Sequence, residues 1–215
     1  MSIKAVIFDL DGVIVTTDQY HYRAWKKIAD QENIYFDEEI NNQLRGVSRM
    51  DSLEIILKRA GRTYSDAEKQ KMAEEKNTVY KELLNSLTGG DILPKVAETL
   101  AELKRRGIPA AIGSSSKNAV FILNKIGLYE AFDAVSDGNN ISKSKPDPEV
   151  FIKAAEMLGI PNSECLVVED ASAGIEAAKA AGMAAAAIGD ARSNQAADYR
   201  IERIDEILAF PGLAS

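Results

Sequence analysis

The chain has 215 residues, of which 46% are hydrophobic and 27% are charged, and its formal net charge is −7. That length suits one large domain or a core domain with a smaller insert, and the acidic balance argues against nucleic acid as a partner. The single cysteine, Cys165, excludes an internal disulfide and predicts a cytoplasmic protein with a buried thiol. No stretch reaches the roughly 18 apolar residues that favour a membrane span, and the first apolar run is too short for a signal peptide.

The first predicted element is a strand over residues 5–8, Ala-Val-Ile-Phe. A short apolar run that ends at Asp and Gly is typical of a strand buried on both faces. Asp9 and Asp11 leave its end two positions apart, so their side chains share a face, and Gly12 allows a sharp turn. These aspartates either cap the next segment or form a site, since open α/β sheets bind ligands at the carboxyl ends of their strands.

Residues 18–85 are predicted to be almost entirely helical. Apolar residues recur at helical spacing in three segments, which begin at about residues 18, 49 and 66. The sequence Ser65-Asp66-Ala67-Glu68 is a capping box that opens the third helix. On that helix we interpret Lys76, which follows two glutamates, as a surface charge, with a position facing a cleft as the alternative.

From residue 94 onward, predicted strands alternate with predicted helices. This alternation is typical of βαβ units and a parallel sheet. Because the helical block separates the first strand from the others, we expect an α/β core of residues 1–17 and 86–215 with an inserted helical domain of residues 18–85. An insert hinged beside the two aspartates can act as a lid. The predicted helices cover 94–106, 117–126, 147–158, 171–181 and 204–209, and the predicted strands cover 108–113, 132–135, 165–168 and 183–188.

Polar residues follow each of the central predicted strands. Ser114 follows the second strand, Lys145 comes after the third, and Glu169 and Asp170 end the fourth. In a parallel sheet all of them lie at the same edge as the two aspartates of the first strand. Clustered carboxylates are costly unless a cation holds them, and oxygen ligands of this number suit Mg²⁺, whereas no Cys or His cluster suits zinc. A lysine, a serine hydroxyl and a helix that begins near Ser116 would bind phosphate.

An aspartate at such a site can itself be the nucleophile in phosphoryl transfer and form an aspartyl-phosphate. The reaction needs cationic groups that reduce the repulsion between carboxylate and phosphate. It also needs an acid/base for the attacking or leaving oxygen. Asp9 and Asp11 fit the roles of nucleophile and acid/base.

Four motifs in this order resemble the haloacid dehalogenase superfamily of phosphotransferases: Asp-Leu-Asp-Gly at 9–12, the serine at 114, Lys-Pro-Asp-Pro at 145–148 and Glu-Asp at 169–170. The resemblance covers the chain from residue 3 to about 188. It implies a Rossmann-like, parallel-sheet core with an all-helical cap after the first motif. It also implies Asp9 as nucleophile, Asp11 as acid/base, Ser114 and Lys145 as phosphate ligands, and Mg²⁺ held by Asp9, the backbone carbonyl of Asp11, and Glu169 or Asp170.

Finer features, such as Arg-Gly-Val-Ser-Arg at 45–49 and Gly-Ser-Ser-Ser-Lys-Asn at 113–118, resemble the phosphosugar mutases of this superfamily. The resemblance implies a second phosphate site, where the phosphate that is not being transferred is held. Its implied ligands are Arg49 from the cap and Ser116, Lys117 and Asn118 from the core, with Gly46 and Val47 along the sugar and His21 touching substrate near the acid/base.

Each of these assignments has a simpler alternative. His21 would lie on the exposed face of a helix, Arg49 would be a solvated charge at a helix end, and Lys117 and Asn118 would be ordinary first-turn residues.

Three functions remain open on the sequence. The first is a mutase that interconverts β-glucose 1-phosphate and glucose 6-phosphate through an aspartyl-phosphate and β-glucose 1,6-bisphosphate. The second is a sugar-phosphate or phosphoglycolate-type phosphatase, which needs only one phosphate site. The third is a phosphate-binding regulator without catalysis, which would need no nucleophile. We expect a monomer that binds small sugar phosphates and neither nucleic acid nor membrane.

Overall fold

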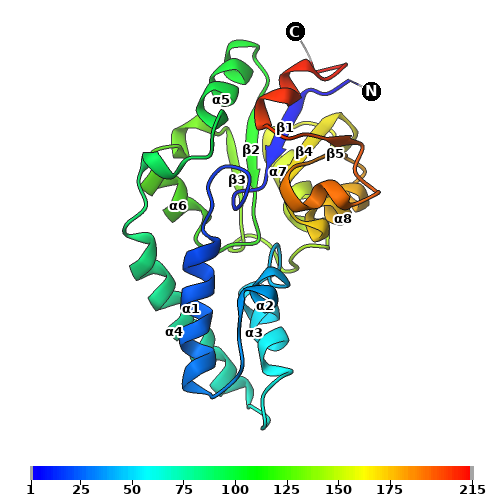
Figure 1. Cartoon of the computed structure of the whole chain (residues 1–215). Coiled ribbons are helices and arrows are strands. Elements are labelled where there is room, and N and C mark those ends of the chain that lie inside the picture. The colour runs from blue at the N-terminus through cyan, green and yellow to red at the C-terminus, as the bar shows by residue number, and fades with distance from the viewer. Residues whose placement is uncertain (1, 214–215) are drawn as a thin grey trace.

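Six parallel strands form the sheet of the computed structural model, which describes residues 2–213 (Figure 1). Their order is β3-β2-β1-β4-β5-β6, so the direction in which strands are added reverses beside β1. This is the order of a Rossmann-like sheet, and it confirms the predicted fold class. The strands are β1 (Ala5–Phe8), β2 (Ala110–Gly113), β3 (Ala134–Ser136), β4 (Cys165–Glu169), β5 (Ala184–Ala187) and β6 (Tyr199–Arg200).

The central strand β1 is apolar throughout because helices cover both faces of the sheet. Val6 and Phe8 point into one hydrophobic core, which α5 and α6 complete. Ala5 and Ile7 point into a second core on the opposite face, together with α7 and α8. A strand buried on both sides needs a continuous apolar run rather than an alternating one. These helices are α5 (Val96–Arg105), α6 (Ala119–Ile126), α7 (Glu149–Leu158) and α8 (Ser172–Ala180).

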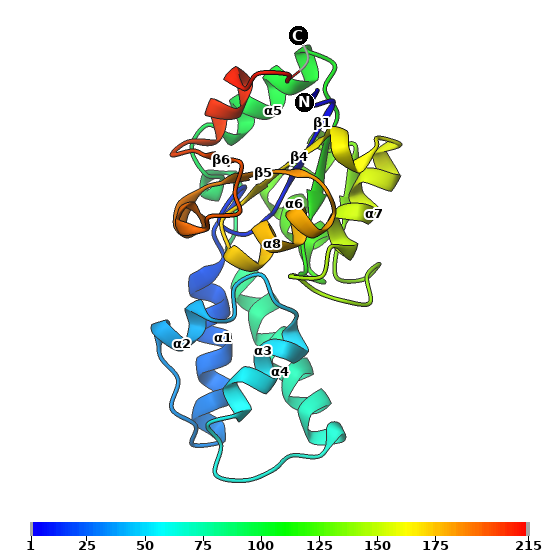
Figure 2. The same cartoon turned by 90° about the vertical axis from the view of Figure 1, so that its right-hand side faces the viewer.

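A block of helices stands against the carboxyl edge of the sheet, at the bottom of both views (Figures 1 and 2). We call it the cap, and the rest of the chain the core. The cap has its own hydrophobic centre, to which Trp25, Leu53 and Met72 belong. The predicted capping box opens its longest helix, since the Ser65 and Glu68 side chains each bond the other's backbone N–H. The cap helices are α1 (Asp18–Gln31), α2 (Glu38–Asn42), α3 (Arg49–Leu57) and α4 (Asp66–Leu84).

Several boundaries differ from the predicted ones. The helix predicted from Pro94 begins at Val96, because Lys95 has a left-handed backbone with φ 70°. The helix predicted at 204–209 is a 3₁₀ helix. The two-residue strand β6 and the five-residue helix α2 were not predicted, because elements this short show no measurable periodicity.

Within residues 2–213, no helix is both long enough and apolar enough to cross a membrane.

Candidate active site

The predicted site residues meet at one cavity of about 1130 Å³ between the cap and the carboxyl edge of the sheet. Its walls come from the ends of β1, β2 and β4, from the loop before α7, and from α1, α3 and α4 of the cap. Of the candidate residues, Glu169 alone does not line the cavity and lies behind its wall. The others line it: Asp9, Asp11, His21, Gly46, Val47, Arg49, Ser114, Ser116, Lys117, Asn118, Lys145 and Asp170.

A buried lysine joins two of the carboxylates at the sheet edge. The Lys145 Nζ atom lies 2.5 Å from Asp9 Oδ1 and 2.7 Å from Glu169 Oε2, and Lys145 is only 1% exposed. Burial alone would lower the pKa of Lys145, but the two carboxylates outweigh it and raise that pKa, so the lysine carries a full positive charge. The ion pairs fix the position of the Asp9 carboxylate at the floor of the cavity.

Three carboxylates form a cluster that suits a metal ion. Asp9, Glu169 and Asp170 each place an oxygen within 4.8 Å of the others. Burial and the neighbouring Asp9 carboxylate raise the pKa of Glu169 to about 7, although Lys145 acts against this. Burial and the repulsion of Glu169, Asp9 and Asp11 raise the pKa of Asp170 to about 9. The single charge of Lys145 therefore does not balance the three carboxylates, and oxygen donors of this kind fit a hard divalent cation.

Two glycines make room for these carboxylates. A Cβ atom on Gly12, which has φ +84°, would lie 2.0 Å from Asp170 Oδ2, and one on Gly174 would lie 2.0 Å from the Glu169 side chain. Neither position tolerates a side chain while the carboxylate stays where it is.

The Asp11 side chain is held at the junction of core and cap. Thr17 donates to its carboxylate from both the backbone N–H, at 2.7 Å, and the hydroxyl, and that hydroxyl also lies 2.8 Å from the Tyr80 hydroxyl of α4. Burial raises the pKa of Asp11 to about 7, with Asp18 acting in the same direction and Thr17 against it. A carboxyl group with such a pKa can hold or accept a proton near neutral pH. Helical spacing places Tyr80 on the buried side of its helix but does not predict this contact, and no sequence pattern pointed to Thr17.

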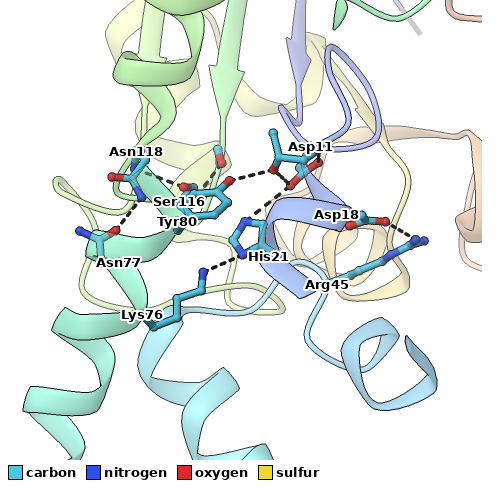
Figure 3. A network of polar contacts seen from close by, with 11 residues as sticks. Asp11, Asp18, His21, Arg45, Lys76, Asn77, Tyr80, Ser116 and Asn118 are labelled. Atoms are coloured by element: carbon cyan, nitrogen blue, oxygen red, sulfur yellow. Dashed lines mark hydrogen bonds and ion pairs between the residues drawn. The ribbon is translucent and has the colours of Figure 1, made fainter. Parts of the chain in front are cut away.

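The interpretation of Lys76 as a surface charge is wrong. It is 2% exposed, lines the cavity, and its Nζ atom lies 2.9 Å from His21 Nδ1 (Figure 3). His21 Nε2 in turn lies 3.7 Å from Asp11 Oδ2, and the ring lies against Tyr80 at a centroid distance of 4.1 Å. Burial and the charge of Lys76 lower the pKa of His21 well below its usual value, so the imidazole is neutral. The available signal was periodicity, since Lys76 lies on the same helical stripe as Met72 and Tyr80.

The loop after β2, which the sequence predicts to bind phosphate, differs from the prediction in one respect. We expected the backbone N–H groups of a helix beginning near Ser116 to face a ligand, but α6 begins at Ala119. The Ser114 hydroxyl instead accepts the Ser116 N–H, and the Ser116 hydroxyl accepts the Asn118 N–H, each at 3.2 Å. Serine side chains compete for such N–H groups in tight turns. The loop therefore offers hydroxyl and amide side chains rather than these two backbone groups.

Two arginines on the cap side have opposite surroundings. Arg45 is paired with two carboxylates, Asp18 and, at 2.7 Å, Asp190 of the core. Arg49 lines the cavity and is half-buried, and within the described part of the chain it forms no ion pair. Burial lowers the pKa of the Arg49 guanidinium, which nevertheless stays charged at any physiological pH. Its charge is thus available for an anion in the cavity.

The fold and this set of side chains define a phosphotransferase of the Rossmann-like class, and the chain belongs to the haloacid dehalogenase-like hydrolase family, whose family model matches residues 3–182. It is 42% identical to the β-phosphoglucomutase of Bacillus subtilis over 95% of this chain and 92% of that protein. The crystal structure of a β-phosphoglucomutase from Clostridium difficile superimposes with a TM-score of 0.91 at 39% identity, covering 95% of this chain and 93% of the other. A fructose-1-phosphate phosphatase of Escherichia coli is 31% identical over 83% of this chain and 92% of its own length.

Proposed function

We propose that this chain is a β-phosphoglucomutase, which interconverts β-glucose 1-phosphate and glucose 6-phosphate through a phosphorylated Asp9 and a bound β-glucose 1,6-bisphosphate. The similarity to the B. subtilis enzyme over nearly the whole of both chains supports this reaction. It is an isomerase, and its partners are small sugar phosphates.

The observation that carries the proposal is that Arg49, which forms no ion pair within residues 2–213, lies in the same cavity as the Asp9 cluster. A mutase must hold a sugar with two phosphates and must bind it in two orientations. It therefore needs one site for the reacting phosphate and one for the idle phosphate. The reacting phosphate is assigned to Asp9, Ser114 and Lys145. The idle phosphate is assigned to Arg49, which can bind it with a bidentate fork, and to Ser116, Lys117 and Asn118.

The transfer step follows from the positions of the two aspartates. An Asp9 carboxylate oxygen forms a bond to phosphorus while the bond from phosphorus to the sugar oxygen breaks, and Asp11 gives its proton to that oxygen. In the step that makes the bisphosphate, Asp11 takes the proton of the free hydroxyl of the sugar monophosphate, and that oxygen attacks phosphorus while the bond from phosphorus to Asp9 breaks. Lys145 balances the negative charge that gathers on the transferring group. The raised pKa of Asp11, about 7, suits both directions.

The carboxylate cluster is assigned to Mg²⁺, with Asp9, the backbone carbonyl of Asp11, Glu169 and Asp170 as candidate ligands. Such an ion would reduce the repulsion between carboxylate and phosphate. His21 would contact the substrate beside Asp11, and Gly46 and Val47 would line the sugar. We also propose that residues 18–85 act as a cap domain on a core of 1–17 and 86–215, and that the protein is a cytoplasmic monomer.

The relationship to phosphatases, including the E. coli enzyme at 31% identity, gives the alternative, in which water rather than a sugar hydroxyl attacks the aspartyl-phosphate. One assay separates the two. The protein is incubated with Mg²⁺, a trace of β-glucose 1,6-bisphosphate and β-glucose 1-phosphate, and glucose 6-phosphate and free phosphate are both followed. The proposal predicts glucose 6-phosphate as the main product. Free phosphate as the main product would contradict the mutase function and support the phosphatase.

A further inference from the structure

A side-chain hydrogen bond joins the cap to the phosphate-binding loop at the wall of the cavity. The Asn118 amide nitrogen donates to the Asn77 carbonyl oxygen of α4 at 2.9 Å (Figure 3). Asn118 is 5% exposed, so its amide is almost removed from water. A buried amide that lost this partner would leave a donor unsatisfied. The bond therefore has a strong influence on how the Asn118 side chain is turned.

The two asparagines have different positions relative to the cavity. Asn118 lines it, whereas Asn77 does not, although the preceding residue Lys76 does. An asparagine amide has two N–H donors and one carbonyl acceptor. When one N–H of Asn118 is given to Asn77, the nitrogen is fixed on the cap side and the second N–H remains for a ligand.

The backbone of Asn118 makes a second contact, within the loop itself. The Asn118 backbone N–H donates to the Ser116 hydroxyl, which leaves the hydroxyl proton of Ser116 free to donate. The Asn118 backbone is thus bonded to the Ser116 hydroxyl, and these are two of the three loop residues that we assign to the idle phosphate, with Lys117 as the third.

We propose that Asn77 is a positioning residue for the idle phosphate, and that it acts through Asn118 by turning an amide N–H toward that phosphate when the cap is closed. This inference rests on the proposed mutase function. The amide is oriented only while α4 lies against the loop, so the idle phosphate binds more tightly to the closed form. By linkage, binding of that phosphate stabilises closure.

The test compares Asn77→Ala, Asn118→Ala and the double variant, with Asn85→Ala, an exposed asparagine at the end of the same helix, as the control. Two quantities are measured: the KM for β-glucose 1,6-bisphosphate as primer, and the rate at which acetyl phosphate phosphorylates Asp9. Asn77→Ala should raise the KM about 5-fold, the effect of one hydrogen bond. It should leave the acetyl phosphate rate within two-fold, because that donor has no second phosphate.

The double variant distinguishes positioning from a general structural role. If Asn77 acts through Asn118, adding Asn77→Ala to Asn118→Ala should change the KM no further. Additive effects, an equal loss in the acetyl phosphate rate, or an unchanged KM in Asn77→Ala would each overturn the inference. Failure of the mutase function itself is recognised separately, since the unsubstituted protein would then release free phosphate instead of glucose 6-phosphate.

Discussion

Lys145 of the core and Arg49 of the cap hold their charges at the cavity in opposite ways, although Arg45 of the cap is paired as Lys145 is. In the core, Lys145 is buried and bonded to both Asp9 and Glu169. In the cap, Arg49 forms no ion pair among the described residues, and Lys76 is buried with a neutral His21 as its neighbour. The core is therefore organised before any ligand arrives, which favours charge stabilisation during phosphoryl transfer. The cap instead presents positive charge that an anion must satisfy.

Under the proposed function, this difference separates two tasks. The fixed core groups would carry out the transfer of phosphate, and the cap groups would select the compounds that carry it and couple their binding to closure of the cavity. Binding energy from the idle phosphate can favour closure and exclude water from Asp9. Substitutions in the core should then abolish every phosphoryl transfer, and those in the cap should act selectively.

The largest effect is expected from Asp9→Asn. An amide is a poor nucleophile and a poor metal ligand, so turnover should fall by on the order of 10⁵- to 10⁶-fold. The fold should survive, since Lys145 keeps its bond to Glu169. Turnover and the melting temperature are measured together. Activity near that of the unsubstituted protein would show that Asp9 is not the nucleophile.

Asp11→Asn should lower transfer to and from the sugar by about 10²- to 10⁴-fold, the range for loss of a general acid/base. Acetyl phosphate has a good leaving group that needs little protonation, so phosphorylation of Asp9 by this donor should be affected much less. Both rates are measured on one preparation. Sugar turnover that persists at the unsubstituted rate would show that another group moves the proton.

Asp170→Asn should raise the Mg²⁺ concentration needed for half-maximal activity by about 10- to 100-fold, since even the loss of an outer-shell partner of a metal ligand has effects of this size. Glu156→Gln is the control, because Glu156 is exposed on α7 and lies outside the carboxylate cluster. A Mg²⁺ titration of both variants checks the assignment. Full activity of the unsubstituted protein after exhaustive chelation would contradict it.

The smallest effect is expected from Lys76→Met, and it concerns stability. Burial, with Arg49 acting in the same direction, lowers the pKa of Lys76 well below its usual 10.5 in the folded protein. At pH values between the lowered pKa and 10.5, Lys76 binds more protons in the unfolded chain than in the folded protein, so stability rises with pH in this range. Lys76 therefore destabilises the fold at neutral pH, and this effect decreases as the pH rises toward 10.5.

Methionine of similar length should therefore raise the melting temperature at pH 7 by a few degrees, since 1 kcal/mol corresponds to about 2–4 °C in a chain of this size. The gain in melting temperature should become smaller toward pH 10. The substitution should also lower mutase activity. Thermal unfolding at several pH values is the measurement, and a lower melting temperature at pH 7 would mean that the buried lysine contributes to stability.

The core was easier to predict from the sequence than the cap. Asp9 follows β1, Glu169 ends β4 and Lys145 lies in the loop after β3. A parallel sheet brings such strand ends to one edge wherever the connecting segments run. The fold class followed for the same reason, because alternating strands and helices permit few arrangements.

The cap contacts could not be predicted because they depend on how one packed unit meets another. Lys76, Asn77 and Tyr80 lie close together on α4. The packing of α4 against α1 inside the cap brings Lys76 to His21, and the docking of α4 against the core brings Asn77 to Asn118 and Tyr80 to Thr17. Helical spacing places Lys76 on the stripe of Met72 and Tyr80, but it does not show that this stripe borders a cavity. The two hydroxyl-bonded turns at Ser114 and Ser116 were missed because serine hydroxyls replaced the expected helix terminus.

The separation of tasks between core and cap is tested most directly with Arg49→Ala. Arg49 lines the cavity from the start of α3, and without it the idle phosphate loses a charged partner. Isomerisation of β-glucose 1-phosphate should fall about 10- to 100-fold, the effect of one charged hydrogen-bond partner. Arg59→Ala is the control, since Arg59 is exposed on the cap and bonds the backbone of its own helix.

The measurement is the ratio of two rates in the same variant: isomerisation of β-glucose 1-phosphate and phosphorylation of Asp9 by acetyl phosphate. If the cap serves the idle phosphate, the first rate falls and the second stays close to that of the unsubstituted protein. Equal losses in both rates would show that Arg49 serves the transferring phosphate or the fold, and would contradict the division of tasks between core and cap.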